Sequence, residues 1–251
     1  NAIDVLTFRD LLTRIDALFE YEEEEDEPGE EVVPKLRDPV VVKKELQALI
    51  SSLEETETKP CGLDGREETD VGVVKLTQEL ETLWRESLGE IGEFDETTLA
   101  GDWELMYSTS AKYRRWQSIL NTEKFIKGGQ VDALVQSFSA EQGALAKEYD
   151  MEEVYLLEGE ELGMRAVGSW TVSLQSNVVT SLEDLVLKLN LSAVDYDTED
   201  GMVEQAEMKL LESQMVRTFC YSYLAYIDDE IRIMRTGLAG NSTFIYQRMK
   251  D

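Results

Sequence analysis

The chain contains no histidine and only two cysteines among its 251 residues. The absence of histidine excludes serine–histidine–aspartate and cysteine–histidine catalysis, the usual zinc sites, and the side chain that most often acts as a general base near neutral pH. Any catalysis would have to use carboxylates, lysine, tyrosine or a cofactor. Cys61 and Cys220 are too few for a disulfide framework, so a reducing compartment is the simpler assumption. The sequence also allows one long-range disulfide bond between these two residues.

Basic residues and long apolar runs are also scarce. There are 24 Lys and Arg residues against 53 Asp and Glu residues, and the net charge of -29 opposes binding to nucleic acid or to an anionic membrane surface. No segment approaches the roughly 18 apolar residues that a membrane-spanning helix needs. The first residues, NAIDVLTFRD, have neither the basic start nor the apolar core of a signal peptide. We therefore expect a globular protein peripheral to any membrane, which is made where it works or has already lost a targeting peptide.

Helical patterns dominate the N-terminal part of the chain. Apolar residues spaced by threes and fours predict helices over residues 5–19, 42–53 and 71–88. An acidic linker at 21–31 follows the first helix, and eight of its eleven residues are acidic. The first helix either folds back on the body of the protein or docks into another protein. We predict a helical extension with an acidic linker at 1–60, and a helical lead-in at 61–98 that packs on the following domain.

Short strands separated by turns fill residues 99–251. Alternation places Trp103, Leu105 and Tyr107 on one face of the first strand, after Gly101, which lets the backbone bend where the strand begins. Later segments repeat the alternation: Arg165–Leu174, Leu185–Leu191 and Arg217–Ile227, the last of which aligns Phe219, Tyr221, Tyr223 and Ala225. About eight to ten such strands with near-neighbour turns favour an antiparallel meander closed into a barrel, because a parallel sheet needs crossover helices. The predicted fold class is mainly β, an antiparallel barrel preceded by an α-helical N-terminal extension.

A basic and aromatic segment, Tyr113-Arg114-Arg115-Trp116, interrupts the acidic background. Such a segment suits a carboxylate or phosphate head group or an acidic neighbour. The alternative is that its arginines pair with some of the chain's own 53 acidic residues.

Both ends of the predicted barrel domain carry a resemblance to a known family. The segment Leu99–Ser110, LAGDWELMYSTS, together with Tyr226–Gly237, YIDDEIRIMRTG, and the closing Ser242–Tyr246, resembles the plastid lipid-associated proteins, also called fibrillins. The resemblance covers roughly the last three fifths of the chain and the helix at 71–88. It implies a lipocalin-like barrel in the plastid (chloroplast), at thylakoids or at the lipid droplets called plastoglobules. It also implies the handling of apolar molecules such as quinones, carotenoids or acyl lipids.

The resemblance and the alternation together define the predicted site residues. On the final hairpin, we expect Asp228 to set the turn and one of Arg232 and Arg235 to pack over the Trp103 indole, a contact worth about 1 kcal/mol. The predicted ligand-binding residues are Trp103, Leu105, Tyr107, Trp170, Leu187, Phe219, Tyr223 and Arg232. The predicted partner-binding residues are Phe8, Leu12, Phe19, Arg114, Arg115 and Trp116.

Two functional hypotheses follow from these residues. In the first, the aromatic face lines a cavity that holds a quinone, carotenoid or acyl lipid. In the second, the barrel is packed solid, and the N-terminal helix and the basic–aromatic segment bind a photosynthetic membrane complex as an assembly subunit. Acidic pairs such as Asp228-Asp229 do not favour an enzyme, because neighbours on a strand point to opposite faces. We expect no catalytic residue, no metal site and no required cofactor.

Overall fold

The computed structural model describes residues 37–54, 67–88, 94–116, 130–139, 147–157, 159–176, 183–196, 219–236 and 242–250. The chain divides into two compact units, Asn1–Leu36 and Arg37–Asp251. The first predicted helix, its residues Phe8, Leu12 and Phe19, and the acidic linker lie outside the described residues.

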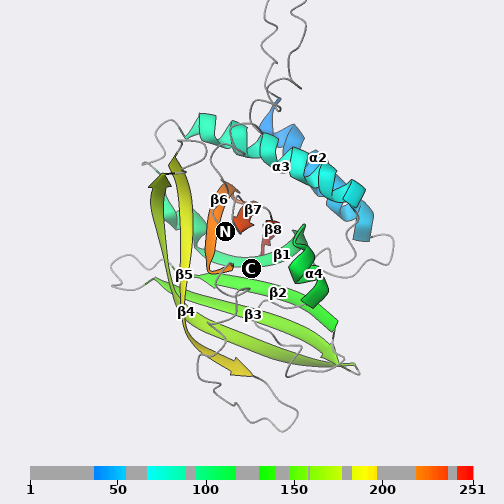
Figure 1. Cartoon of the computed structure of the whole chain (residues 1–251), viewed down its shortest axis with the longest axis vertical. Helices are drawn as coiled ribbons and strands as arrows, with labels where there is room; N and C mark the ends of the chain where they lie inside the picture. The colour runs from blue at the N-terminus through cyan, green and yellow to red at the C-terminus, as the bar shows by residue number, and fades with distance from the viewer. Residues whose placement is uncertain are drawn as a thin grey trace, which may run out of the picture. The chain divides into compact units, whose positions relative to one another are not determined.

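Eight strands form a closed antiparallel barrel (Figure 1). Each strand pairs with the next along the chain, and β1 pairs with β8 to close the ring. The strands are β1 (Gly101–Ser108), β2 (Gln130–Phe138), β3 (Glu148–Leu157), β4 (Glu160–Ser176), β5 (Glu183–Tyr196), β6 (Tyr221–Ile227), β7 (Ile231–Thr236) and β8 (Ser242–Arg248). The predicted mainly β, lipocalin-like barrel with N-terminal helices is therefore confirmed.

Four helical segments accompany the barrel in the described residues: α2 (Pro39–Glu54), α3 (Glu67–Ser87), the short 3-10 helix η3 (Glu96–Leu99) and α4 (Ala111–Trp116). Asp38 begins α2, because its Oδ1 accepts a hydrogen bond from the Val40 backbone N–H at 2.9 Å. The helix then places an apolar residue every four positions, at Val42, Leu46 and Ile50, so that one face is buried.

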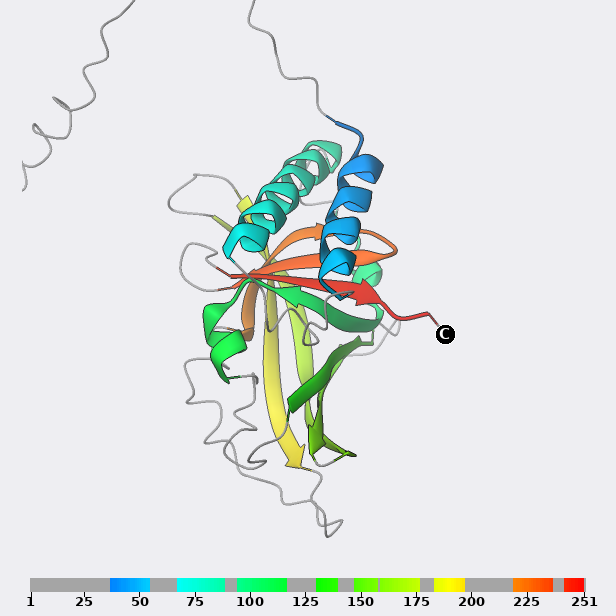
Figure 2. The same ribbon diagram turned by 90° about the vertical axis from the view of Figure 1, so that its right-hand side faces the viewer.

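The pair α2 and α3 covers the outer face of the barrel along β6, β7, β8 and β1 (Figure 2). The outer cluster formed there consists of Val42, Leu46, Ile50, Val73, Leu80, Tyr107, Ala225, Tyr226, Ile231, Ile233 and Ile245. Because α2 belongs to the compact unit 37–251, the predicted boundary at residue 60 falls between two helices that pack on one barrel.

Ion pairs at the edges of the outer cluster fix the helices on the barrel. Lys43 of α2 contacts Asp228 in the β6–β7 turn, with 2.8 Å between Nζ and Oδ2. From α3, Glu81 contacts Arg235 of β7 at 2.9 Å, and Arg85 contacts Asp184 of β5 at 2.5 Å. The helix pair is thus held by charge at its rim and by apolar packing at its centre.

Register shifts occur in four strand pairings, and two of them affect strands whose side chains were assigned to faces from the sequence. The register of β1 against β8 shifts between Leu105 and Tyr107, and that of β6 against β7 shifts between Leu224 and Tyr226. A bulge inserts one extra residue, so the residues beyond it lie on the face opposite to that expected from simple alternation.

Candidate ligand-binding site

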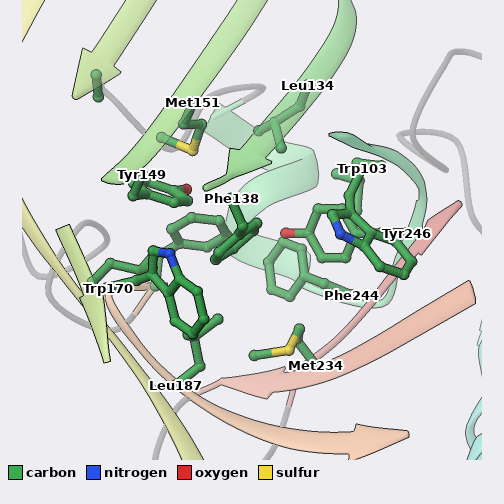
Figure 3. Packing of buried hydrophobic residues seen from close by; sticks show 14 of the residues in the cluster. Trp103, Leu134, Phe138, Tyr149, Met151, Trp170, Leu187, Met234, Phe244 and Tyr246 are labelled. Carbon is green, nitrogen blue, oxygen red and sulfur yellow. The ribbon is translucent and has the colours of Figure 1, made fainter. Parts of the chain in front are cut away.

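The barrel interior is a continuous apolar cluster rich in aromatic rings. Phe138 lies at its centre, with ring centroids 5.1 Å from Tyr149 and 5.7 Å from Trp170. Figure 3 shows side chains from opposite walls converging there, with Trp103 beside Tyr246 on one side and Trp170 beside Leu187 on the other. Methionines at 151, 164 and 234 complete the lining, and their unbranched thioether side chains adapt readily to new neighbours.

Six of the eight predicted ligand-binding side chains meet in this interior. Five belong to the interior cluster: Trp103, Leu105, Trp170, Leu187 and Phe219. The sixth, Arg232, is fully buried against rings of the same cluster. The residues come from β1, β4, β5 and β7 and from the turn before β6, so the closed barrel brings together positions far apart in the sequence.

Tyr107 lies outside the barrel, and the prediction that it shares a face with Trp103 and Leu105 is wrong. The bulge in β1 turns Tyr107 into the outer cluster under the helices. Its hydroxyl donates to Asp70 Oδ1 at 2.9 Å. Burial, followed by this hydrogen bond to a carboxylate, raises the pKa of Tyr107 to about 12.

Tyr223 is also on the outer face, so its prediction as a lining residue is wrong. The ordered alternation of β6 begins only at Tyr221, and it buries Ser222 and Leu224 instead. Tyr223 is half-buried and packs edge-on against Tyr221, with 6.2 Å between ring centroids. Phe219 precedes the strand and therefore does not follow its alternation. Ala225, aligned with Phe219 by the sequence pattern, lies in the outer cluster.

Arg114 pairs with an acid of the same chain, which was the alternative left open by the sequence. Its Nη1 and Nη2 donate to Oδ2 and Oδ1 of Asp70, each at 2.6 Å, and its guanidinium lies 5.3 Å from the Tyr107 ring centroid. The short helix α4 is thereby tied to α3 and β1. The side chains of Arg115 and Trp116, also predicted to bind a partner, lie outside the described residues.

One end of the barrel is sealed by η3 and Trp103. The indole Nε1 donates to the Leu99 carbonyl at 2.9 Å, and Leu99 itself is buried. Arg248 of β8 lies 4.2 Å from the Trp103 ring centroid, and its Nη2 donates to the Thr98 carbonyl at 2.6 Å while Nη1 donates to that of Ala100. Gly101 has φ 115°, and a Cβ there would lie 2.7 Å from Arg248 Nη1.

Arg232 forms a polar layer just inside this sealed end. Its guanidinium carbon lies 5.0, 4.7 and 4.3 Å from the ring centroids of Trp103, Phe138 and Tyr246. The predicted contact between a hairpin arginine and the Trp103 indole is therefore confirmed. Its Nη2 donates to Gln136 Oε1, and Gln136 Nε2 donates to the Tyr149 hydroxyl at 2.9 Å.

The pKa values in the interior follow from burial. Burial lowers the pKa of Arg232 to about 10, which leaves the guanidinium protonated at neutral pH. Burial likewise raises the pKa of the Tyr149 hydroxyl well above its ordinary value. The pKa of the free Cys220 thiol rises to about 12 for the same reason, so this thiol is a poor nucleophile.

Two residues of the polar layer, Gln136 and Tyr149, were missed by the sequence predictions, as was Arg248. Gln136 shares the inward face of β2 with Leu134 and Phe138. A polar residue on an otherwise apolar strand face was a signal available in the sequence. Arg248 carried no such signal, because its acceptors are backbone carbonyls.

The described part of the chain contains neither a cluster of metal ligands nor a membrane-spanning helix. No group of three or more Cys, Asp or Glu residues within the described ranges is placed to hold a metal ion. None of the helices in those ranges combines the length and apolar character required to cross a membrane.

Comparison with known proteins does not show which family the chain belongs to. No family model, curated protein or solved structure matches the chain. The class defined by the fold and the site is therefore that of a lipocalin-like closed barrel with an aromatic interior, one sealed end and a buried arginine.

Proposed function

We propose that this chain is a non-catalytic, fibrillin-like plastid protein that binds a hydrophobic small molecule inside its barrel. The ligand classes are quinones, carotenoids and acyl lipids, and the place of action is the thylakoid or the plastoglobule. The family, the compartment and the ligand classes are supported by the motifs at both ends of the barrel domain, LAGDWELMYSTS and YIDDEIRIMRTG.

The observation that carries the proposal is the composition of the interior. Eight-stranded barrels are just wide enough either to be filled by side chains or to hold one small ligand. Here the inward faces are apolar and aromatic, and one end is sealed by Trp103 and η3. Met151, Met164 and Met234 supply walls that can repack around a bound molecule.

A second candidate is the structural or assembly subunit of a photosynthetic membrane complex. The dense ring packing around Phe138 favours it, because a solid interior leaves binding to the outside of the molecule. In that case the N-terminal helix and the basic–aromatic segment at 113–116 would bind the complex.

Extraction of the protein from its source decides between the two candidates. The protein is isolated under mild conditions, and bound small molecules and co-purifying proteins are identified by mass spectrometry. A stoichiometric quinone, carotenoid or acyl lipid supports the carrier. An empty barrel that co-purifies with a membrane complex and is released from it by deletion of residues 1–31 supports the subunit.

A pair of matched variants locates the ligand. Leu187→Trp adds bulk inside the barrel, where Leu187 is only 2% exposed, whereas Leu174→Trp adds the same bulk at a position that is 40% exposed. The carrier hypothesis predicts that only the Leu187 variant loses the co-purified molecule. Equal retention by both variants would place the ligand outside the barrel and contradict the proposal.

A further inference from the structure

Among the residues that the structure describes, no ion pair is seen for the buried positive charge of Arg232. Arg232 is fully buried, and its Nη2 donates to the neutral side chain of Gln136. Its Nε and Nη1 have no partner within the part of the chain that the structure describes. Glu153, the buried carboxylate of β3, accepts a hydrogen bond from the Tyr155 hydroxyl at 3.1 Å.

The groups described around Arg232 are the uncharged side chains of Gln136 and Tyr149 and three aromatic rings. The Tyr149 hydroxyl accepts a hydrogen bond from Gln136 Nε2, so its own proton is left to donate. The ring centroids of Trp103, Phe138 and Tyr246 lie 4.3 to 5.0 Å from the guanidinium carbon. A buried charge is strongly unfavourable unless it is paired and hydrogen-bonded. The missing component of this site is therefore an anion.

The surroundings restrict that anion to one class. A single guanidinium neutralises a single negative charge, so a monoanion matches it better than a phosphate dianion. Beyond the polar layer the interior is mainly apolar, with Met151, Leu187 and Met234 among its lining residues, although the buried Glu153 alternates in phase with Met151 on β3. A molecule that satisfies both regions has one compact anionic group and a long apolar chain.

We infer that the barrel binds a long-chain monocarboxylate whose carboxylate accepts hydrogen bonds from Arg232 and Tyr149 at the sealed end. The inference rests on the proposed function and narrows it from hydrophobic molecules in general to fatty-acid-type ligands. The apolar chain then extends from Trp103 towards the opposite end of the barrel.

The test compares an acid with its ester. The full-length protein is first freed of bound lipid on a hydrophobic resin, and its affinity for fluorescent cis-parinaric acid and for the methyl ester is measured by titration. The ester has the same chain and no charge. We expect the acid to bind about 10-fold to 100-fold more tightly than the ester, the range for hydrogen bonds to a charged partner.

Three variants assign the preference to the polar layer. Arg232→Met should weaken binding of the acid to the level of the ester and leave the ester unchanged. Tyr149→Phe removes a single hydroxyl and should weaken binding of the acid alone, by about 3-fold to 10-fold. Arg165→Met is the matched control, because the Arg165 side chain is 61% exposed on β4 and pairs with Asp150. It should change neither affinity.

The outcomes separate this inference from the proposed function. If the wild-type protein binds acid and ester equally, the carboxylate site is refuted while the hydrophobic carrier stands. If it binds neither probe, the carboxylate site and acyl ligands are refuted, and the extraction experiment then decides whether the barrel carries a quinone or carotenoid instead. Circular dichroism shows whether Arg232→Met folds. If it does not fold, the ratio of the affinities for acid and ester, measured on the wild type and on Tyr149→Phe, still tests the carboxylate site.

Discussion

Replacement of Arg248 by methionine tests whether the sealed end holds the barrel together. Arg248 connects three segments through its guanidinium: η3 through the Thr98 carbonyl, the start of β1 through the Ala100 carbonyl, and the β6–β7 turn through the Asp229 carbonyl at 3.0 Å. It also lies over the Trp103 ring at 4.2 Å. Methionine keeps much of the apolar stem and removes all of these polar contacts.

The expected loss follows from the contacts. Three hydrogen bonds at about 1 kcal/mol each, with a cation–π contact of about 0.5 kcal/mol, give a destabilisation of about 3.5 kcal/mol. For a domain of this size, that loss corresponds to a fall in melting temperature of about 7–14 °C. Urea denaturation followed by tryptophan fluorescence measures the free energy of unfolding, and the slope of the transition checks that the native state is still compact.

The matched control is Arg165→Met, which removes an arginine whose exposed ion pair with Asp150 contributes at most about 1 kcal/mol. The reasoning is refuted if Arg248→Met loses no more stability than this control. Gly101→Ala provides a second check, because its Cβ would lie 2.7 Å from Arg248 Nη1. The losses in the double variant should therefore be less than additive.

Two further predictions concern other parts of the fold. Gly168→Ala should destabilise the protein by about 3 kcal/mol, because its Cβ would lie 2.2 Å from the Asn190 carbonyl oxygen, a backbone atom. Gly163→Ala meets only the flexible end of Glu152 at 3.2 Å, and equal melting temperatures for the two variants would contradict the argument. Burial opposes ionisation of Asp228, but hydrogen bonds from Lys43 and from backbone N–H groups outweigh it and hold the pKa below its ordinary value. This stabilisation is present above the unfolded-state pKa of about 4 and is lost as the pH falls through the lower folded-state pKa. Asp228→Asn should therefore cost about 1 kcal/mol in urea unfolding near pH 7 and much less near pH 2, and equal losses at both pH values would refute the assignment.

The barrel could be predicted because the patterns that specify it, alternation and short turns, lie within short segments of the sequence. Period-two alternation and short turns specify antiparallel neighbours, and the helix at 42–53 already showed the buried face formed by Val42, Leu46 and Ile50. Asp228 was correctly expected to set the final turn, where its Oδ1 accepts hydrogen bonds from the backbone N–H groups of Glu230 and Ile231, each at 2.8 Å.

The error at Tyr107 has a physical origin in the pairing of strands, because a bulge depends on the partner strand as well as on the strand that carries it. In β1 the shift between Leu105 and Tyr107 arises in the pairing with β8, more than a hundred residues away. Nothing in the sequence around Tyr107 shows that the residue leaves the interior. The same limit applies to Arg248, whose carbonyl acceptors at Thr98, Ala100 and Asp229 are groups that every residue possesses.

Strand β7 is the strand in which alternation is least informative. Its outward residues, Ile231 and Ile233, are apolar because α2 and α3 cover that face, so both faces of the strand are buried and alternation alone cannot tell inside from outside. Arg232, the charged residue between these two isoleucines, points into the barrel and contacts the Trp103 ring. Met234, the next inward residue, is buried in the interior cluster, so this wall readily accepts an apolar side chain. Position 232 therefore does not require a charged residue for packing alone. The contacts of Arg232 with the rings and with Gln136, together with the proposed carboxylate site, give reasons for an arginine there.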